Sequence, residues 1–132
     1  MSQSYGHTRT LTGVSFADAV QRVTAALKEE GFGILTDIDV QATMQAKLGV
    51  QVRPYRILGA CNPPLAHRAL AADPLIGLLL PCNVIVFEDA EGAVTVSAID
   101  PMAMVQMADS AELSAVAQEA DVRLQRVVAA LP

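Results

Sequence analysis

The residues that most suggest chemistry are the only two cysteines of the chain, Cys61 and Cys82. They lie in the similar segments 55–62 and 80–87, where an asparagine directly follows each cysteine. Both segments are typical of strands. If these strands are antiparallel neighbours, the end of the first and the start of the second meet at the same edge of the sheet. We therefore expect the two thiols to lie near one another at this edge, while the register that decides their contact stays open.

Cys61 is expected to be the more nucleophilic of the two thiols. It directly precedes a predicted helix that Asn62 caps and Pro63 begins, and the free backbone donors at such a terminus favour a thiolate. The helix dipole contributes only about 0.3–1 kcal/mol, so it is a weak activator by itself. His67, about one turn into the same helix, would add to the activation if its side chain pointed back toward Cys61.

Of the two asparagines that follow the cysteines, Asn83 is the better candidate for a polar anchor of a ligand. Asn62 is explained by helix capping, whereas Asn83 lies within an apolar strand and would need a buried hydrogen-bond partner. The sequence therefore predicts a ligand-binding site at the sheet end that consists of Cys61, Asn62, Cys82, Asn83 and His67. No catalytic residue is assigned.

The two cysteines could also serve without binding any ligand. Buried cysteines most often act as small apolar core residues. A disulfide would require the two Cα atoms to come within about 7 Å, and in a reducing compartment it would act as a switch. Together with His67 the thiols would suit a soft metal, but no spacing matches a known metal signature. No metal ligand is therefore assigned, and the cofactor is unknown.

The remaining polar residues carry no signature of a standard enzyme class. Asp37 and Asp39 alternate onto one face of a predicted strand, and Asp39 is expected to cap a helix. His7 is expected at the surface or in a partner contact, with no catalytic triad to join. The sequence contains no serine nucleophile elbow, phosphate loop or dinucleotide fingerprint. Whether the protein is an enzyme therefore stays open.

The composition indicates a single domain spanning residues 1–132. Apolar residues make up 52% of the chain and charged residues 17%, which is typical of a folded core. Nine Lys and Arg residues and a net charge of −5 disfavour nucleic acid as a partner. We recognise no signal peptide and no membrane span, since the most apolar stretch, 75–87, is short and is expected to be a buried strand. These features predict a cytoplasmic protein with reduced thiols.

Periodicity and turn signals predict an α+β fold. The order is strand, helix, four strands and helix, with short helical segments between strands, which indicates an antiparallel sheet with its main helices on one face. Ser15 is expected to cap the first helix and Gly31 to end it, and Asp109 with Glu112 forms a capping box for the last helix. The predicted strands are 4–11, 33–39, 55–61, 80–87 and 93–99. In the second of these strands, Ile34 and Ile38 are expected to share one face.

Several segments together resemble the domain of unknown function 302 family. The resemblance covers most of the chain, from about Phe16 to the last helix, and its most specific part is the two cysteine segments. It is carried by residues 31–35, 37–39, 47–49, 55–63, 77–83 and 100–101. It implies a TBP-like fold with the element order given above, in a small bacterial or archaeal domain that forms a dimer. It implies no function, and it implies no DNA binding because the chain lacks a basic surface.

Two functions follow as hypotheses. In the first, the protein binds a small ligand, a sulfur species or a soft metal at the sheet end that carries Cys61 and Cys82. In the second, it is a non-catalytic homodimeric interaction module whose cysteines are core packing. The exposed strand edges or the methionine-rich segment 102–107 would then contact the other subunit.

Overall fold

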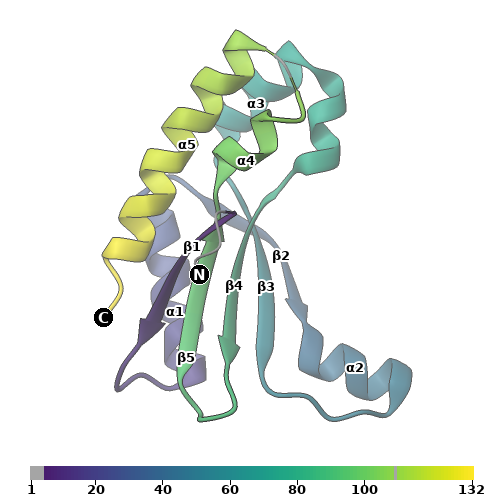
Figure 1. Cartoon of the computed structure of the whole chain (residues 1–132), viewed down its shortest axis with the longest axis vertical. Helices are drawn as coiled ribbons and strands as arrows, with labels where there is room; N and C mark the ends of the chain where they lie inside the picture. The colour runs from purple at the N-terminus through teal and green to yellow at the C-terminus, as the bar shows by residue number, and fades with distance from the viewer. Residues whose placement is uncertain (1–4, 109) are drawn as a thin grey trace.

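The computed structural model describes residues 5–108 and 110–132, which form a five-stranded antiparallel sheet with helices (Figure 1). The sheet order is β1-β5-β4-β3-β2, and every neighbouring pair is antiparallel. The strands are β1 (Gly6–Leu11), β2 (Gly33–Asp39), β3 (Tyr55–Cys61), β4 (Cys82–Glu88) and β5 (Val94–Ile99). The helices are α1 (Phe16–Glu29), α2 (Val40–Leu48), α3 (Pro63–Ala72), the 3-10 helix η1 (Pro74–Leu79), α4 (Pro101–Val105) and α5 (Ala111–Ala129). The predicted order of strands and main helices is confirmed.

The main helices lie on one face of the sheet, as predicted. Alternate residues of the central strands point toward this face and are buried, and they meet the apolar stripes of α1 and α5. The strand residues are Leu58, Ala60, Val84, Val86, Val94, Val96 and Ala98, and the helix residues are Ala19, Val23, Leu27, Leu124, Val127 and Val128. This layer is the main core of the domain.

Helices α1 and α2 have the caps that the sequence predicted. Ser15 accepts a hydrogen bond from the Asp18 backbone N–H at 3.1 Å, and Asp39 accepts one from Ala42 at 2.9 Å. Gly31 ends α1 with a φ of +85°, a conformation that favours glycine. These local signals are confirmed because each depends only on neighbouring residues.

The cap of α5 differs from the prediction. Ser110 is the N-cap, and its side chain accepts a hydrogen bond from the Leu113 N–H at 3.3 Å. Glu112 is therefore the second helical residue and not the third, so the predicted capping box is wrong. Asp109 itself lies outside the described residues.

A β-bulge in β2 overturns the expected face of Ile38. Ile34 pairs with Ala60 and Thr36 with Gly59, so Leu35 is an extra residue that no residue of β3 opposes. The extra residue reverses the alternation beyond it. Ile34 consequently packs against the main core, whereas Ile38 lies on the opposite face of the sheet and is exposed.

The apolar stretch 75–87 is not one buried strand. Its first part belongs to η1, where Leu75 and Leu78 are 70% and 84% exposed while Ile76 is buried. Ile76 joins a second, smaller core at the end of the sheet, between α3, η1 and α5. Figure 1 shows these elements together beyond the upper end of the strands. No helix in the described residues combines the length and the apolar character needed to cross a membrane.

Candidate ligand site at the sheet end

The two cysteine segments lie on neighbouring antiparallel strands, as predicted. Cys61 is the last residue of β3 and Cys82 the first of β4. The register pairs Cys82 with Ala60, so the two cysteines are offset by one residue and are not directly opposite. Both are free thiols. The expected cysteine pair is therefore not confirmed, because the register does not place one thiol against the other.

A cavity of about 330 Å³ lies next to both cysteines. It is enclosed by the ends of β3 and β4 and by α3, η1, α4 and α5, the elements of the smaller core. Its wall is apolar, with Leu65, Ile76, Val116 and Ala120 among the lining residues, and none of the lining residues carries a charge. The sheet end that the cysteine motif indicated thus contains a concave apolar site.

The cavity meets solvent between β2 and α3. Leu35, the extra residue of the bulge, lines the cavity and is 66% exposed. Two further lining residues, Leu70 of α3 and Gly77 of η1, are also exposed. The bulge therefore has a direct effect on the site, since it turns Leu35 out of the regular alternation to the rim.

Asn62 holds the inner end of this site in place. It is buried, its Oδ1 accepts a hydrogen bond from the Leu65 N–H at 3.3 Å, and its Nδ2 donates to the Glu30 carbonyl at 3.4 Å. Arg123 of α5 donates to the same carbonyl at 2.9 Å. The carbonyl at the end of α1 thus joins α3 and α5, and Asn62, a cap as predicted, is hydrogen-bonded at both ends of its amide.

The Cys82 thiol is expected to stay protonated at neutral pH. Burial raises the pKa of the Cys82 thiol to about 11, and Cys61 adds a smaller electrostatic contribution. At pH 7 only about one Cys82 in ten thousand is therefore a thiolate. Cys82 consequently acts as an apolar lining residue at neutral pH, which is what a buried cysteine usually is.

Two of the predicted site residues lie elsewhere. Asn83 is exposed and pairs with Gly59, and neither Asn83 nor His67 lines the cavity. Strand alternation explains the first result, because Cys82 and Asn83 point to opposite faces of the sheet. His67 is exposed because α3 turns its apolar side, with Leu65 and Ala69, toward the smaller core.

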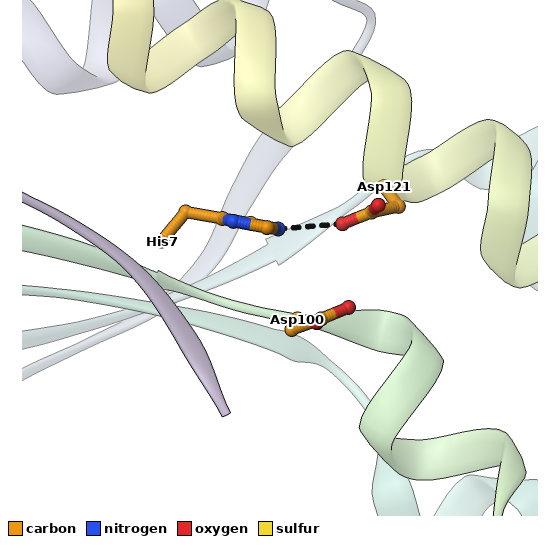
Figure 2. A group of neighbouring side chains, drawn as sticks. All are labelled: His7, Asp100 and Asp121. Atoms are coloured by element: carbon orange, nitrogen blue, oxygen red, sulfur yellow. Dashed lines mark hydrogen bonds and ion pairs between the residues drawn. The ribbon is translucent and has the colours of Figure 1, made fainter. Parts of the chain in front are cut away.

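A second group of polar residues was missed from the sequence. His7 of β1, Asp121 of α5 and Asp100, which follows β5, bring their ligand atoms within 4.8 Å of one another (Figure 2). From the sequence, His7 is expected at the surface or in a partner contact, whereas the structure shows it partly buried against Asp121. His7 and Asp121 are separated by 114 residues, so no local spacing could reveal the contact.

The fold and the cavity define a small α+β domain whose smaller core, at one end of the sheet, encloses an apolar site. The chain belongs to the family described as "Domain of unknown function DUF302", whose model matches residues 7–131. It is similar to the solved structure entitled "Crystal structure of uncharacterized conserved protein DUF302 from Bacillus stearothermophilus". The similarity has a TM-score of 0.89 and 27% sequence identity, and it covers 98% of this chain and 100% of that one. No match is found among curated proteins.

Proposed function

We propose that this domain binds a small, mainly apolar ligand in the cavity at the sheet end. The observation that carries the proposal is the cavity itself, about 330 Å³ with an apolar wall and an exposed rim. Ligand sites in proteins are typically apolar clefts of roughly 300–1,000 Å³. Close-packed interiors seldom leave an empty space of this size, which favours an occupant.

The cavity volume supports a ligand of one or two rings or a chain of about ten carbons. An apolar cavity of about 150 Å³ is enough for benzene, and the site has about twice that volume. Because no lining residue is charged, an ionised group of the ligand would remain at the rim near Leu35 and Leu70. A soft metal between the thiols is less favoured than a neutral ligand, since it would have to displace the proton of Cys82.

The proposal is tested with the neutral fluorophore N-phenyl-1-naphthylamine and two variants of one helix. Ala117 lines the cavity, whereas Ala115 on the same helix is exposed and does not. We expect saturable fluorescence enhancement with the wild type and Ala115→Leu, and at least about tenfold weaker binding to Ala117→Leu, whose added side chain occupies the cavity. Urea unfolding of each variant verifies that it is folded.

A second measurement on the wild type requires no substitution. Because Cys61 lines the cavity, bound fluorophore should slow its alkylation under native conditions, as read by peptide mass spectrometry. Equal binding to a folded Ala117→Leu, together with an unchanged rate at Cys61, would overturn the proposal.

We propose homodimer formation as a second function, in agreement with the interaction-module hypothesis. It is supported by large apolar side chains that are exposed to solvent near the sheet end. These are Leu75 and Leu78 of η1, and Met107, whose exposed fraction is 76%. The test is sedimentation equilibrium of the wild type and Leu78→Glu, with Val122→Glu on α5 as the control at another exposed apolar residue. We expect a dimer that only Leu78→Glu dissociates, and a monomeric wild type would contradict this.

The location that we propose is the cytoplasm. Free thiols at both cysteines are compatible with a reducing compartment.

A further inference from the structure

We propose that His7, Asp100 and Asp121 form a binding site for a divalent transition-metal ion, separate from the apolar cavity. Figure 2 shows the three side chains converging from a strand, a helix and the segment after β5. One imidazole nitrogen and two carboxylate oxygens lie within 4.8 Å of one another. The inference does not depend on the proposed ligand function.

The fold directs these side chains to one point. His7 pairs with Ala98 of β5, whose side chain lies in the main core, so His7 also points to the face that α5 covers. Asp121 is on α5, and its Oδ1 lies 2.6 Å from His7 Nε2. Asp100 directly follows β5 and precedes α4, which places it beside the end of the edge strand that contains His7.

Both carboxylates are oriented by a further hydrogen bond. Gln125 Nε2 donates to Asp121 Oδ2 at 2.8 Å, and the Met102 backbone N–H donates to Asp100 Oδ1 at 2.9 Å. Among the described residues, Asp100 Oδ2 therefore has no hydrogen-bond partner, and the only partner of Asp121 Oδ1 is His7. Such second contacts are the usual means by which proteins orient metal ligands.

The charge of the group favours a cation. In residues 5–108 and 110–132, Asp100 forms no ion pair, and the partner of Asp121 is His7 alone. Within the part of the chain that the structure describes, these two carboxylates therefore form no ion pair with a lysine or arginine, although the side chains are partly removed from water: that of His7 is 26% and that of Asp121 16% exposed. A dication would compensate this negative charge.

The donor atoms indicate the class of metal. A nitrogen and two oxygens suit Zn²⁺, Co²⁺ or Mn²⁺ better than Ca²⁺, which prefers oxygen alone, or Cu⁺, which prefers sulfur. Metal–ligand distances of about 2.0–2.2 Å require the three atoms to move somewhat closer together. The ion would replace the hydrogen bond between His7 and Asp121, with release of any proton that blocks the coordinating nitrogen. Three protein ligands leave further coordination positions for water.

In the experiment, Co²⁺ is added to the metal-free protein and its binding is monitored by the visible absorption of the ion. The bound Co²⁺ is then displaced with Zn²⁺. We expect one equivalent to bind the wild type and an affinity at least about tenfold lower for His7→Ala and Asp121→Asn. His67→Ala changes the only other histidine, which is exposed, and should bind as the wild type does.

Two further variants separate a metal site from a simple ion pair and from the thiols. Asp100→Asn leaves the contact of His7 with Asp121 intact, so it should lose metal affinity while its urea midpoint without metal stays unchanged. The double variant Cys61→Ala/Cys82→Ala should retain binding. The proposal is overturned if the wild type binds no Co²⁺ or Zn²⁺, if His7→Ala binds equally well, or if binding disappears with the cysteines.

Discussion

His7 Nε2 lies 2.6 Å from Asp121 Oδ1 and so connects the edge strand β1 to the last helix, α5. Arg9, two residues further along the same face of β1, donates to the carbonyls of Val128 and Ala129 at 3.2 Å and 3.0 Å. These carbonyls belong to the C-terminal end of α5, where the helix dipole favours a cation. Polar contacts at two points thus hold the edge strand against the helix, in addition to its apolar contact through Leu11.

Arg9→Met should destabilise the domain by about 1 kcal/mol. The substitution retains much of the aliphatic side chain but removes both hydrogen bonds to the end of α5. Arg22→Met is the control, because within residues 5–108 and 110–132 Arg22 forms only an exposed pair with Asp18 one turn earlier on α1, and its loss should cost less than about 0.5 kcal/mol. Urea unfolding measures both values. Equal midpoints for the two variants would show that the contacts of Arg9 add nothing.

Gly59→Ala should destabilise the domain by about 1–3 kcal/mol. A Cβ atom at this buried position would overlap Thr36 Oγ1 and lie 2.8 Å from Pro81 Cγ. Gly33→Ala is the matched control on the neighbouring strand, since a Cβ there meets nothing within 4 Å. Thr36→Ala in the Gly59→Ala background should recover part of the loss, as measured by urea unfolding. A Gly59→Ala variant no less stable than Gly33→Ala would contradict the close contact between β2 and β3.

Gly31→Ala should cost more stability than Gly49→Ala. Both glycines follow a helix with positive φ, +85° and +67°, so both substitutions carry a conformational cost of about 1–2 kcal/mol. At Gly31 the added Cβ would also lie 2.9 Å from Asn62 Nδ2, whereas at Gly49 it meets open space. A double-mutant cycle with Asn62→Ala should bring the cost at Gly31 down to that at Gly49. Additivity of the two changes would show that Asn62 is not the obstacle.

Cys82 should make the stability fall as the pH rises from about 9 to 11. Burial raises the pKa of its thiol from 9.0 to about 11, so in this range the unfolded chain loses the proton while the folded chain keeps it. The stabilisation from the neutral thiol is fully present below pH 9 and decreases above it, by about 1–3 kcal/mol in total. The measurement compares urea unfolding at pH 8 and pH 10.5.

The matched variants for this measurement are Cys82→Ala and Cys61→Ala. Cys82→Ala should lose a smaller part of its stability over this range, because it lacks the titrating group. Cys61→Ala should lose about as much as the wild type. Parallel curves for the wild type and Cys82→Ala would rule out the raised pKa as a source of pH dependence.

The sequence was sufficient for features that depend on local chemistry or simple alternation. The caps Ser15, Asp39 and Asn62 are each recognisable from the residues beside them. The strands that end in Cys61 and begin with Cys82 were expected to be neighbours because consecutive strands usually lie side by side. The family and its fold were also recognised correctly.

Features that depend on register or on distant packing could not be obtained in this way. A single extra residue, Leu35, reversed the expected face of Ile38, and no local signal marks such a bulge. The convergence of His7, Asp100 and Asp121 depends on how α5 crosses the sheet. The cavity is likewise a result of packing between helices, and the exposed leucines of η1 carry the same apolar signal in the sequence as buried ones.

The bulge at Leu35 also bears on how the domain avoids uncontrolled association. β2 lies at one end of the sheet order, and a regular edge strand presents backbone donors and acceptors to which any extended chain can add. The extra residue interrupts that repeat near the middle of the strand, and two charged side chains lie on the part that follows, namely Asp37, which forms an ion pair with Arg56, and Asp39. We therefore expect the same irregularity that shapes the rim of the cavity to disfavour strand addition at this edge.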